Sequence, residues 1–152
     1  MNSENVYDQS IAILKKNKVR ITPQRQIILK YLINHHNHPS VETIYEALAN
    51  DFSNLSMATV YNTLRLLEDL NIIIQLPNKD GGVRFDFFGE PHFHAICENC
   101  GKITDIKYPK YSQLDQELRD ITSQQDPGFK PTKSKIEVYG LCKDCQAKLN
   151  HK

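Results

Sequence analysis

The sequence has no apolar run that approaches the roughly 18 to 20 residues needed to cross a bilayer. Its first residues, Met1 to Asn5, contain neither a basic leader nor the apolar segment of a signal peptide. Cysteine is scarce, with four residues in 152, and disulfides are disfavoured in a chain without an export signal. These absences predict a soluble, cytoplasmic protein with no membrane partner, and they favour metal binding or redox chemistry for the cysteines.

The chain length of 152 residues, with 39% hydrophobic and 24% charged residues, suits one large domain or two small ones. A globular chain of this size buries about 70% of the surface that it exposes when unfolded. A metal is therefore not needed merely to form a core, and any metal site is expected to have a local role.

Acidic residues are absent between Gln9 and Val41, although the formal net charge of the whole chain is only +1. A local cationic face on a nearly neutral protein suits a polyanion that is bound on one side. The alternative is a solvated helix surface. The basic residues of this stretch are Lys15, Lys16, Lys18, Arg20, Arg25 and Lys30.

Apolar residues recur at helical spacing through residues 6–33, with a break at residues 17–18. Thr22 lies before a proline, which is a good arrangement for a helix N-terminus, and Ser40 and Ser56 can cap two further helices. Three or four short helices are therefore expected. The last of them is expected to bury Met57, Val60, Leu64 and Leu67.

A β-hairpin is predicted directly after these helices. Residues 72–76 are mostly β-branched or apolar, residues 77–82 carry turn signals, and a second strand extends to Phe88. Helices followed by such a hairpin are typical of a winged helix-turn-helix, in which the last helix enters the major groove of DNA. Residues 1–88 are therefore expected to form a DNA-binding domain.

Residues 91–152 are expected to form a small α/β domain, after a boundary near residues 89–91, so that the whole chain has an α+β fold. Strands are predicted at residues 92–97, 102–108 and 135–141. A domain of about 60 residues is marginal alone, which favours a metal or a partner chain. A helix is predicted at residues 111–121, with Leu114, Leu118 and Ile121 facing inward.

The four cysteines form two Cys-x-x-Cys pairs, Cys97 with Cys100 and Cys142 with Cys145. Four thiolates on two tight turns can close a tetrahedron around zinc, with no open position for catalysis. The 41 residues between the pairs exceed a usual spacing, but the longer loop adds only about 0.8 kcal/mol of closure entropy. Zinc binding, at about 10 to 16 kcal/mol, outweighs that cost. The alternative, a redox Cys-x-x-Cys, does not explain why there are two.

A second group of candidate ligands carries nitrogen and oxygen atoms. His92 and His94 alternate along a predicted strand, so both imidazoles lie on one face. Asp86 lies among apolar residues of the hairpin, Asp105 lies on the next strand, and His38 lies in a loop before the third helix. Such a set suits Fe²⁺ or Mn²⁺, whereas the alternative for the two histidines alone is a polar strand face.

If His38 and the later ligands hold one ion, metal binding would favour one arrangement of the two domains, which is an allosteric device. His35, His36 and His151 are expected to be solvated.

The helix after Ser56 is the expected DNA-reading element, although an ordinary amphipathic helix packed on a partner is the alternative. Asn and Arg side chains can make bidentate contacts to adenine and guanine, while other residues contact phosphates and position the protein. The expected base-reading residues are Ala58, Tyr61, Asn62 and Arg65. The expected phosphate-binding residues are Ser56, Thr59, Arg20, Arg25, Lys15 and Lys18.

Several motifs, taken together, resemble the ferric uptake regulator family, and specifically its peroxide-sensing repressor branch, over about residues 7–149. They are residues 20–25 (RITPQR), 38–39 (HP), 58–62 (ATVYN), 84–86 (RFD) and 92–102 (HFHAICENCGK). The resemblance implies a homodimeric winged-helix repressor of operator DNA that contains structural zinc and regulatory Fe²⁺ or Mn²⁺. It assigns zinc to Cys97, Cys100, Cys142 and Cys145, and the regulatory ion to His38, Asp86, His92, His94 and Asp105.

In that branch, peroxide reacts at bound iron and oxidises a histidine ligand, which releases DNA. By resemblance the oxidised residues are His38 and His92, and Mn²⁺ would make the repressor insensitive to peroxide. One difference is Thr63, where related sequences often have asparagine. Two alternatives are a regulator that responds to iron, manganese or zinc level alone, and a non-haem iron enzyme. No cofactor loop or nucleophile constellation in the sequence supports an enzyme.

Overall fold

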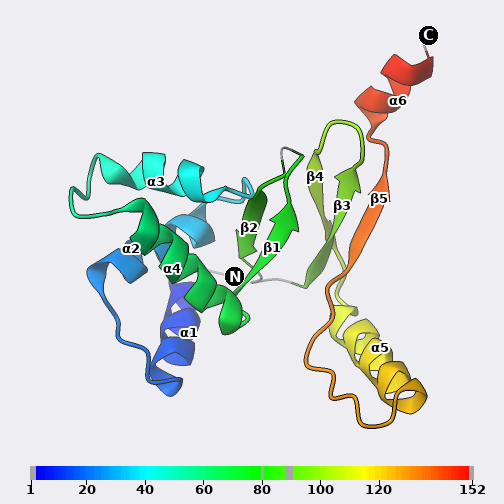
Figure 1. Cartoon of the computed structure of the whole chain (residues 1–152), viewed down its shortest axis with the longest axis horizontal. Coiled ribbons are helices and arrows are strands. Elements are labelled where there is room, and N and C mark those ends of the chain that lie inside the picture. Colours follow the sequence, from blue (N-terminus) through cyan, green and yellow to red (C-terminus); the bar gives the residue numbers. More distant parts are fainter. Residues whose placement is uncertain (1–2, 80, 88–90, 151–152) are drawn as a thin grey trace. The chain divides into compact units, whose positions relative to one another are not determined.

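The computed structural model describes residues 3–79, 81–87 and 91–150. The chain divides into two compact units, Met1–Gly89 and Glu90–Lys152 (Figure 1). Helices and two small sheets together make the α+β fold that the sequence predicts. The predicted strand end at Phe88, the predicted boundary at residues 89–90 and His151 lie outside the described residues.

Four helices lie in the described part of the first unit, and three of them begin at the predicted caps. In each of these three, a hydroxyl oxygen accepts a hydrogen bond from the backbone amide three residues later, which satisfies a donor that the helix leaves unpaired. The helices are α1 (Ser3–Lys16), α2 (Pro23–Asn34), α3 (Val41–Ala49) and α4 (Met57–Asp69). The capping bonds are Arg25 N to Thr22 Oγ1 (3.2 Å), Thr43 N to Ser40 Oγ (3.1 Å) and Thr59 N to Ser56 Oγ (3.1 Å).

The core of the first unit takes one buried stripe from each helix. Most of the predicted inward residues are buried, but Met57 is 39% exposed and that prediction is wrong. The reason is that the buried stripe of α4 also includes Thr63, so it is rotated away from the first residue of the helix. The fully buried members are Leu14, Ile28, Leu29, Leu32, Ile44, Val60, Leu64, Leu67 and Ile73.

The predicted hairpin follows α4. Strand β1 (Ile73–Pro77) pairs antiparallel with β2 (Val83–Phe87), so that Asp86 lies opposite Ile74. Phe85 and Phe87 belong to the core cluster. Because side chains alternate along a strand, the opposite face of β2 carries Arg84 and Asp86.

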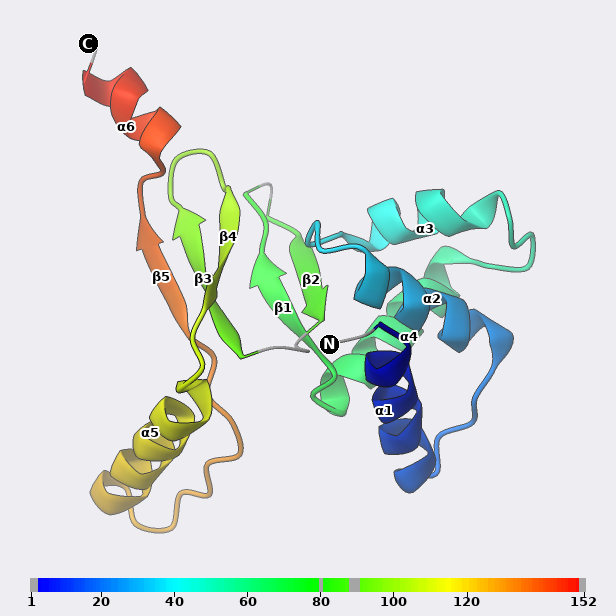
Figure 2. The ribbon, with the colours of Figure 1, turned by 180° about the vertical axis from the view of Figure 1, so that it is seen from behind.

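The second unit is built on a three-stranded sheet with the order β4-β3-β5. Strand β3 (His92–Cys97) pairs antiparallel with β4 (Ile103–Lys107) and parallel with β5 (Glu137–Gly140). The last predicted strand of the unit, β5, therefore lies beside its first strand, β3. Figure 2 shows the three strands side by side.

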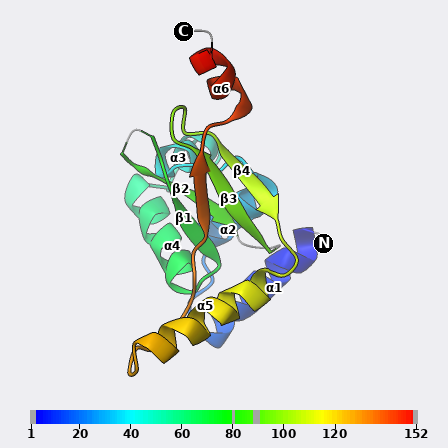
Figure 3. The same ribbon diagram turned by 90° about the vertical axis from the view of Figure 1, so that its right-hand side faces the viewer.

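Two helices lie at opposite ends of this sheet, α5 (Tyr111–Gln125) and α6 (Lys143–Asn150) (Figures 2 and 3). The sequence analysis does not predict α6, which directly follows β5 and carries Cys145. None of the described helices is both long and apolar enough to cross a membrane.

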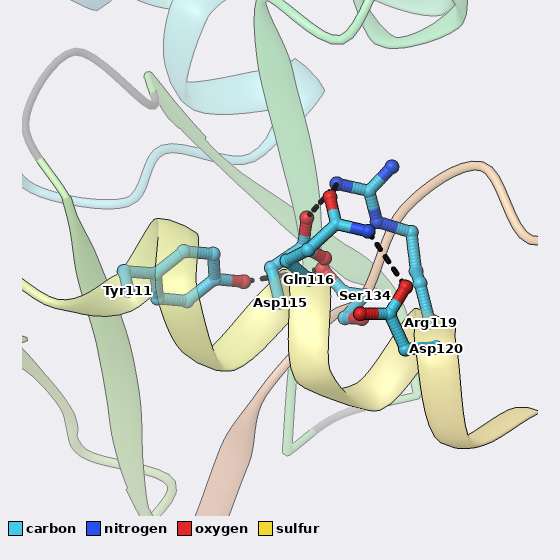
Figure 4. A network of polar contacts seen from close by, with 6 residues as sticks. All are labelled: Tyr111, Asp115, Gln116, Arg119, Asp120 and Ser134. Carbon is cyan, nitrogen blue, oxygen red and sulfur yellow. Dashed lines mark hydrogen bonds and ion pairs between the residues drawn. The ribbon is translucent and has the colours of Figure 1, made fainter.

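The inward face predicted for α5 is not buried in the single chain. Leu118 is 40% exposed and Ile121 is 42% exposed, because a sheet of three strands provides little surface to cover them. One polar contact in Figure 4, from Tyr111, joins α5 to the segment before β5, and the others lie within the helix. Tyr111 donates a hydrogen bond to the Ser134 carbonyl at 3.1 Å, and an ion pair of 2.9 Å joins the α5 residues Arg119 and Asp115.

Candidate metal centres and nucleic-acid interface

The four cysteines of the second unit converge as predicted. Cys97 is the last residue of β3 and Cys100 lies in the turn after it, whereas Cys142 directly precedes α6 and Cys145 lies in its first turn. All four Sγ atoms lie within 4.8 Å of one another, and Cys100 Sγ lies 3.7 Å from Cys142 Sγ. Zn–S bonds of about 2.3 Å in a tetrahedron require sulfurs about 3.8 Å apart. The geometry therefore fits a zinc ion with four sulfur ligands.

The electrostatics of this cluster also suit a bound cation. The Cys97 sulfur accepts hydrogen bonds from the amides of Cys100 (3.5 Å) and Cys142 (3.4 Å), and these bonds lower the pKa of Cys97 to about 6. At Cys145 the Asn99 amide, at 3.2 Å, favours the thiolate, but hydrogen bonds that the Cys145 thiol donates to neighbouring sulfurs, together with burial, outweigh it and raise the pKa to about 11. Cys97 therefore forms a thiolate readily, whereas Cys145 needs a bound metal ion to deprotonate near neutral pH.

The second unit also holds two buried imidazoles beside an exposed carboxylate. Asp105 lies opposite His94 in the β3–β4 pairing. The His94 Nε2 atom lies 3.3 Å from Asp105 Oδ1, and His92 Nε2 lies 3.9 Å from the same oxygen. The two rings meet edge to face with centroids 4.8 Å apart. Both histidines are buried, so the strand predicted to present them on one face does so.

The first unit holds a second buried pair, His38 and Asp86. The His38 side chain is 7% exposed and that of Asp86 3%, and their potential ligand atoms lie within 4.8 Å of each other. The His38 loop lies against β2, because the Phe85 amide donates to the Pro39 carbonyl at 2.9 Å. An imidazole and a carboxylate buried together can provide two ligands to a divalent cation.

Two other histidines of the same loop are solvated, as predicted. His35 and His36 are exposed, and the His35 ring stacks on Tyr31 with centroids 4.1 Å apart. Neither belongs to the buried pair.

Helix α4 presents the predicted DNA-reading residues on its exposed face. Tyr61 is 52% exposed, and Ala58, Asn62 and Arg65 are exposed as well. Thr63, a residue that differs from the asparagine expected by resemblance, lies on the opposite face and is 4% exposed. The exposed face is therefore free of this difference.

The cationic stretch is divided between surface and structural roles. Lys15, Lys18 and Arg20 are exposed, whereas the Arg25 guanidinium donates a hydrogen bond of 2.6 Å to the Arg20 carbonyl. At the start of α4, the Ser56 and Thr59 hydroxyls lie 2.9 Å apart and cap the helix. Arg25, Ser56 and Thr59 thus have structural contacts in addition to the DNA contacts predicted for them.

Sequence reasoning missed one functional arrangement, the contact between Arg84 and the His38 loop. Arg84 Nε donates to the His38 carbonyl at 2.6 Å, and Nη2 donates to the Asn37 carbonyl at 2.8 Å. The only local signal was the alternation of Arg84 with Asp86 along a predicted strand. The partners lie 46 and 47 residues away in the chain, beyond the reach of a local pattern.

Known proteins resemble the chain over nearly its whole length. The model of the ferric uptake regulator family matches residues 16–139. The peroxide-responsive repressor PerR of Staphylococcus saprophyticus is 48% identical over 145 residues, which are 95% of each chain. The PerR of Staphylococcus aureus strain USA300 is 46% identical over the same length and coverage.

Solved structures give the same picture. PerR from Streptococcus pyogenes has 34% sequence identity and a TM-score of 0.54, with 93% of each chain covered. The ferric uptake regulator Fur from Helicobacter pylori has 27% identity and a TM-score of 0.68, with 96% of this chain and 95% of that chain covered.

Proposed function

The chain belongs to the ferric uptake regulator family of metal-dependent regulators, and on this premise we propose that it is a peroxide-responsive repressor. In this proposal a homodimer binds operator DNA while its regulatory site holds a metal ion, and it leaves the DNA when peroxide oxidises a ligand of iron. The proposed function is not enzymatic, because the peroxide reaction alters a side chain of the protein itself and not a separate substrate. The site of action is the cytoplasm, where the DNA is.

The structural metal in this proposal is zinc, held by Cys97, Cys100, Cys142 and Cys145. The convergence of four sulfurs at zinc-like separations supports it. The ion links the turn after β3 to the start of α6. A zinc with four sulfur ligands has no open position, so its role is to hold the small second unit together.

The regulatory metal is Fe²⁺ or Mn²⁺, and the observation that carries this proposal is that each unit holds buried histidine close to a carboxylate, Asp86 in the first unit and Asp105 in the second. The first unit would contribute His38 and Asp86, and the second His92, His94 and Asp105. Nitrogen and oxygen donors of this kind prefer harder cations than the cysteine cluster does. If the two sets bind one ion, its occupancy favours one arrangement of the units, and DNA affinity follows that arrangement.

The response to peroxide depends on how close the imidazoles are to the ion. An iron ion held by these residues would activate hydrogen peroxide beside them, and peroxide is the two-electron oxidant of the ring in the overall reaction. In the net change, one oxygen is added to the ring of His38 or His92 and the other leaves as water. An oxidised ring is a poorer nitrogen donor, so that metal affinity and DNA affinity fall together. Manganese does not support this chemistry.

The DNA interface in this proposal is the exposed face of α4. Asn62 and Arg65 read base edges, and Ala58 and Tyr61 add apolar contacts. Ser56, Thr59, Arg20 and Arg25 position the helix on phosphates, with Lys15 and Lys18. The support is that Ala58, Tyr61, Asn62 and Arg65 are exposed on one side of a capped helix whose other side is buried.

Homodimerisation is supported by apolar side chains that the second unit leaves exposed in the single chain. They are Leu118, Ile121, Val138, Tyr139 and Leu141. A second copy of this unit can cover them, and a dimer gives the two-fold symmetry that a palindromic operator needs.

The test is a DNA-binding titration with zinc-loaded protein and added Fe²⁺ or Mn²⁺, before and after hydrogen peroxide. With Fe²⁺, we expect peroxide to abolish binding and to add the mass of one oxygen to a peptide that contains His38 or His92. With Mn²⁺, binding should survive. Loss of binding with both metals, or loss without a mass change in either peptide, would contradict the mechanism.

The second candidate function is a regulator that responds to metal level alone. The observation in its favour is that the same donors can hold Mn²⁺ without any redox step. The titration separates the two, because such a regulator would bind DNA in proportion to the metal concentration and would keep binding after peroxide with either metal.

A further inference from the structure

The loop that carries His38 is fastened to β2 by side-chain and backbone hydrogen bonds. The Arg84 guanidinium donates to the carbonyls of His38 (2.6 Å) and Asn37 (2.8 Å), and the Phe85 amide donates to the Pro39 carbonyl (2.9 Å). Arg84 is half-buried. The planar fork of a guanidinium holds its donors in fixed directions, so two bonds from one side chain fix two successive carbonyls together.

The loop needs such support because of its backbone conformation. His38 has a φ angle of +50°, which residues with a β-carbon rarely adopt and which persists only where neighbouring contacts impose it. The two carbonyls that Arg84 binds lie on either side of this φ angle. The guanidinium therefore acts on the peptide groups that determine where the His38 imidazole lies.

Arg84 also shares a strand face with the other ligand of the first unit. Arg84 and Asp86 are two residues apart in β2, and alternation along a strand puts their side chains on the same side. Strand β2 thus positions the Asp86 carboxylate directly, and it positions the His38 imidazole through the hydrogen bonds of Arg84. The potential ligand atoms of His38 and Asp86 lie within 4.8 Å of each other. This short separation depends both on the position of Asp86 in β2 and on the hydrogen bonds from Arg84.

We propose that Arg84 is a positioning residue for His38, which it holds in the metal-binding conformation through its hydrogen bonds to the Asn37 and His38 carbonyls. The inference rests on the proposed metal-sensing function. Without the two bonds, the loop occupies other conformations for part of the time, and metal affinity falls by the fraction of time that the correct conformation is lost.

The experiment is a double-mutant cycle on the full zinc-loaded chain, with Mn²⁺ affinity measured by titration calorimetry. The variants are Arg84→Gln, His38→Ala and the double variant. Loss of a group that orients a metal ligand typically lowers affinity by about 10- to 100-fold. We expect Arg84→Gln to weaken Mn²⁺ binding by at least about tenfold. In the His38→Ala background the same substitution should have an effect within about twofold.

Two further variants separate position from charge. Lys79→Gln removes a cation from an exposed site in the turn of the same hairpin and should leave Mn²⁺ affinity unchanged. Arg84→Lys keeps the charge but loses the fork, and it should give an intermediate affinity. Equal losses for Arg84→Gln in both backgrounds, or full affinity in Arg84→Lys together with a loss in Lys79→Gln, would overturn the inference. The first outcome would indicate that Arg84→Gln affects the fold in general, and the second would indicate that only the positive charge matters.

A second measurement uses peroxide. In the iron-loaded protein, Arg84→Gln should shift the added oxygen from the His38 peptide toward the His92 peptide, because His38 is then less often bound to the ion. An unchanged ratio of the two oxidised peptides would overturn the inference. The two proposals can fail separately. If the mutant cycle shows coupling between Arg84 and His38 but the wild-type, iron-loaded protein still binds DNA after peroxide, the inference holds and the proposed function fails.

Discussion

At the scale of single residues, the proposed DNA contacts divide into contacts to bases and contacts to phosphates. Arg65 is exposed on the face of α4 opposite Val60, and Lys15 is exposed near the end of α1. A base contact contributes affinity for one sequence, whereas a phosphate contact contributes to all sequences and releases a counterion. The two residues should therefore respond differently to the same substitution.

We expect Arg65→Ala to lower affinity for operator DNA by roughly 1 to 3 kcal/mol with little effect on random DNA. We expect Lys15→Ala to weaken both and to reduce the slope of log K against log salt by about one. Fluorescence anisotropy over a salt series measures both quantities. Parallel losses on both DNAs for Arg65→Ala would remove it from the base-reading set.

Another residue-scale prediction concerns Tyr139 at the exposed edge strand. Its hydroxyl donates a hydrogen bond to Glu137, and this bond, with a smaller effect of burial, raises the pKa of Tyr139 above its ordinary value of 10.0. The neutral phenol is thus favoured in the folded state. Its contribution to stability is complete below pH 10.0 and is lost as the pH rises through the folded-state pKa.

Substitution Glu137→Gln should move the ionisation of one of the seven tyrosines to lower pH, because a neutral amide no longer repels the phenolate. Ultraviolet absorbance of tyrosinate during an alkaline titration measures it. Glu117→Gln on the exposed face of α5 is the control and should leave the curve as in wild type. Superimposable curves for Glu137→Gln and wild type would show that the bond has no effect on Tyr139.

At the scale of elements, two helices offer a matched pair of caps. Ser56 caps α4 and Ser40 caps α3, each by accepting an amide hydrogen bond of 3.1 Å. Loss of such a cap costs about 1 kcal/mol. We expect Ser56→Ala and Ser40→Ala to lower the free energy of unfolding by similar amounts in urea, while only Ser56→Ala weakens DNA binding. Equal DNA affinities of the two variants would place the interface elsewhere than the start of α4.

The elements that the sequence predicts well are those with local signals. Thr22, Ser40 and Ser56 are caps that act within one turn, and the hairpin turn carries proline and glycine at residues 77–82. The exposure of Leu118 and Ile121 could not be predicted in this way, because a helical stripe shows that a face is apolar and not what covers it. Helix α6 is short and polar, so its periodicity is weak.

At the scale of the whole molecule, the parts of the candidate site that rest on local motifs can be predicted from the sequence, and the parts that rest on distant contacts cannot. The cysteine pairs are local motifs, and their convergence follows from the parallel pairing of β3 with β5. The buried character of His92 and His94 follows from strand alternation. The role of Arg84 is non-local, since its partners are separated from it by 46 and 47 residues, and only the folded first unit reveals it.

The central claim is that the histidine–carboxylate sets of the two units bind one shared ion. Anomalous diffraction from crystals of the Mn²⁺-loaded, zinc-containing protein measures this directly. The account predicts one manganese peak per chain, at coordination distance from His38 and Asp86 and also from His92, His94 and Asp105. A manganese peak coordinated by the residues of only one unit, or separate peaks in the two units, would contradict it.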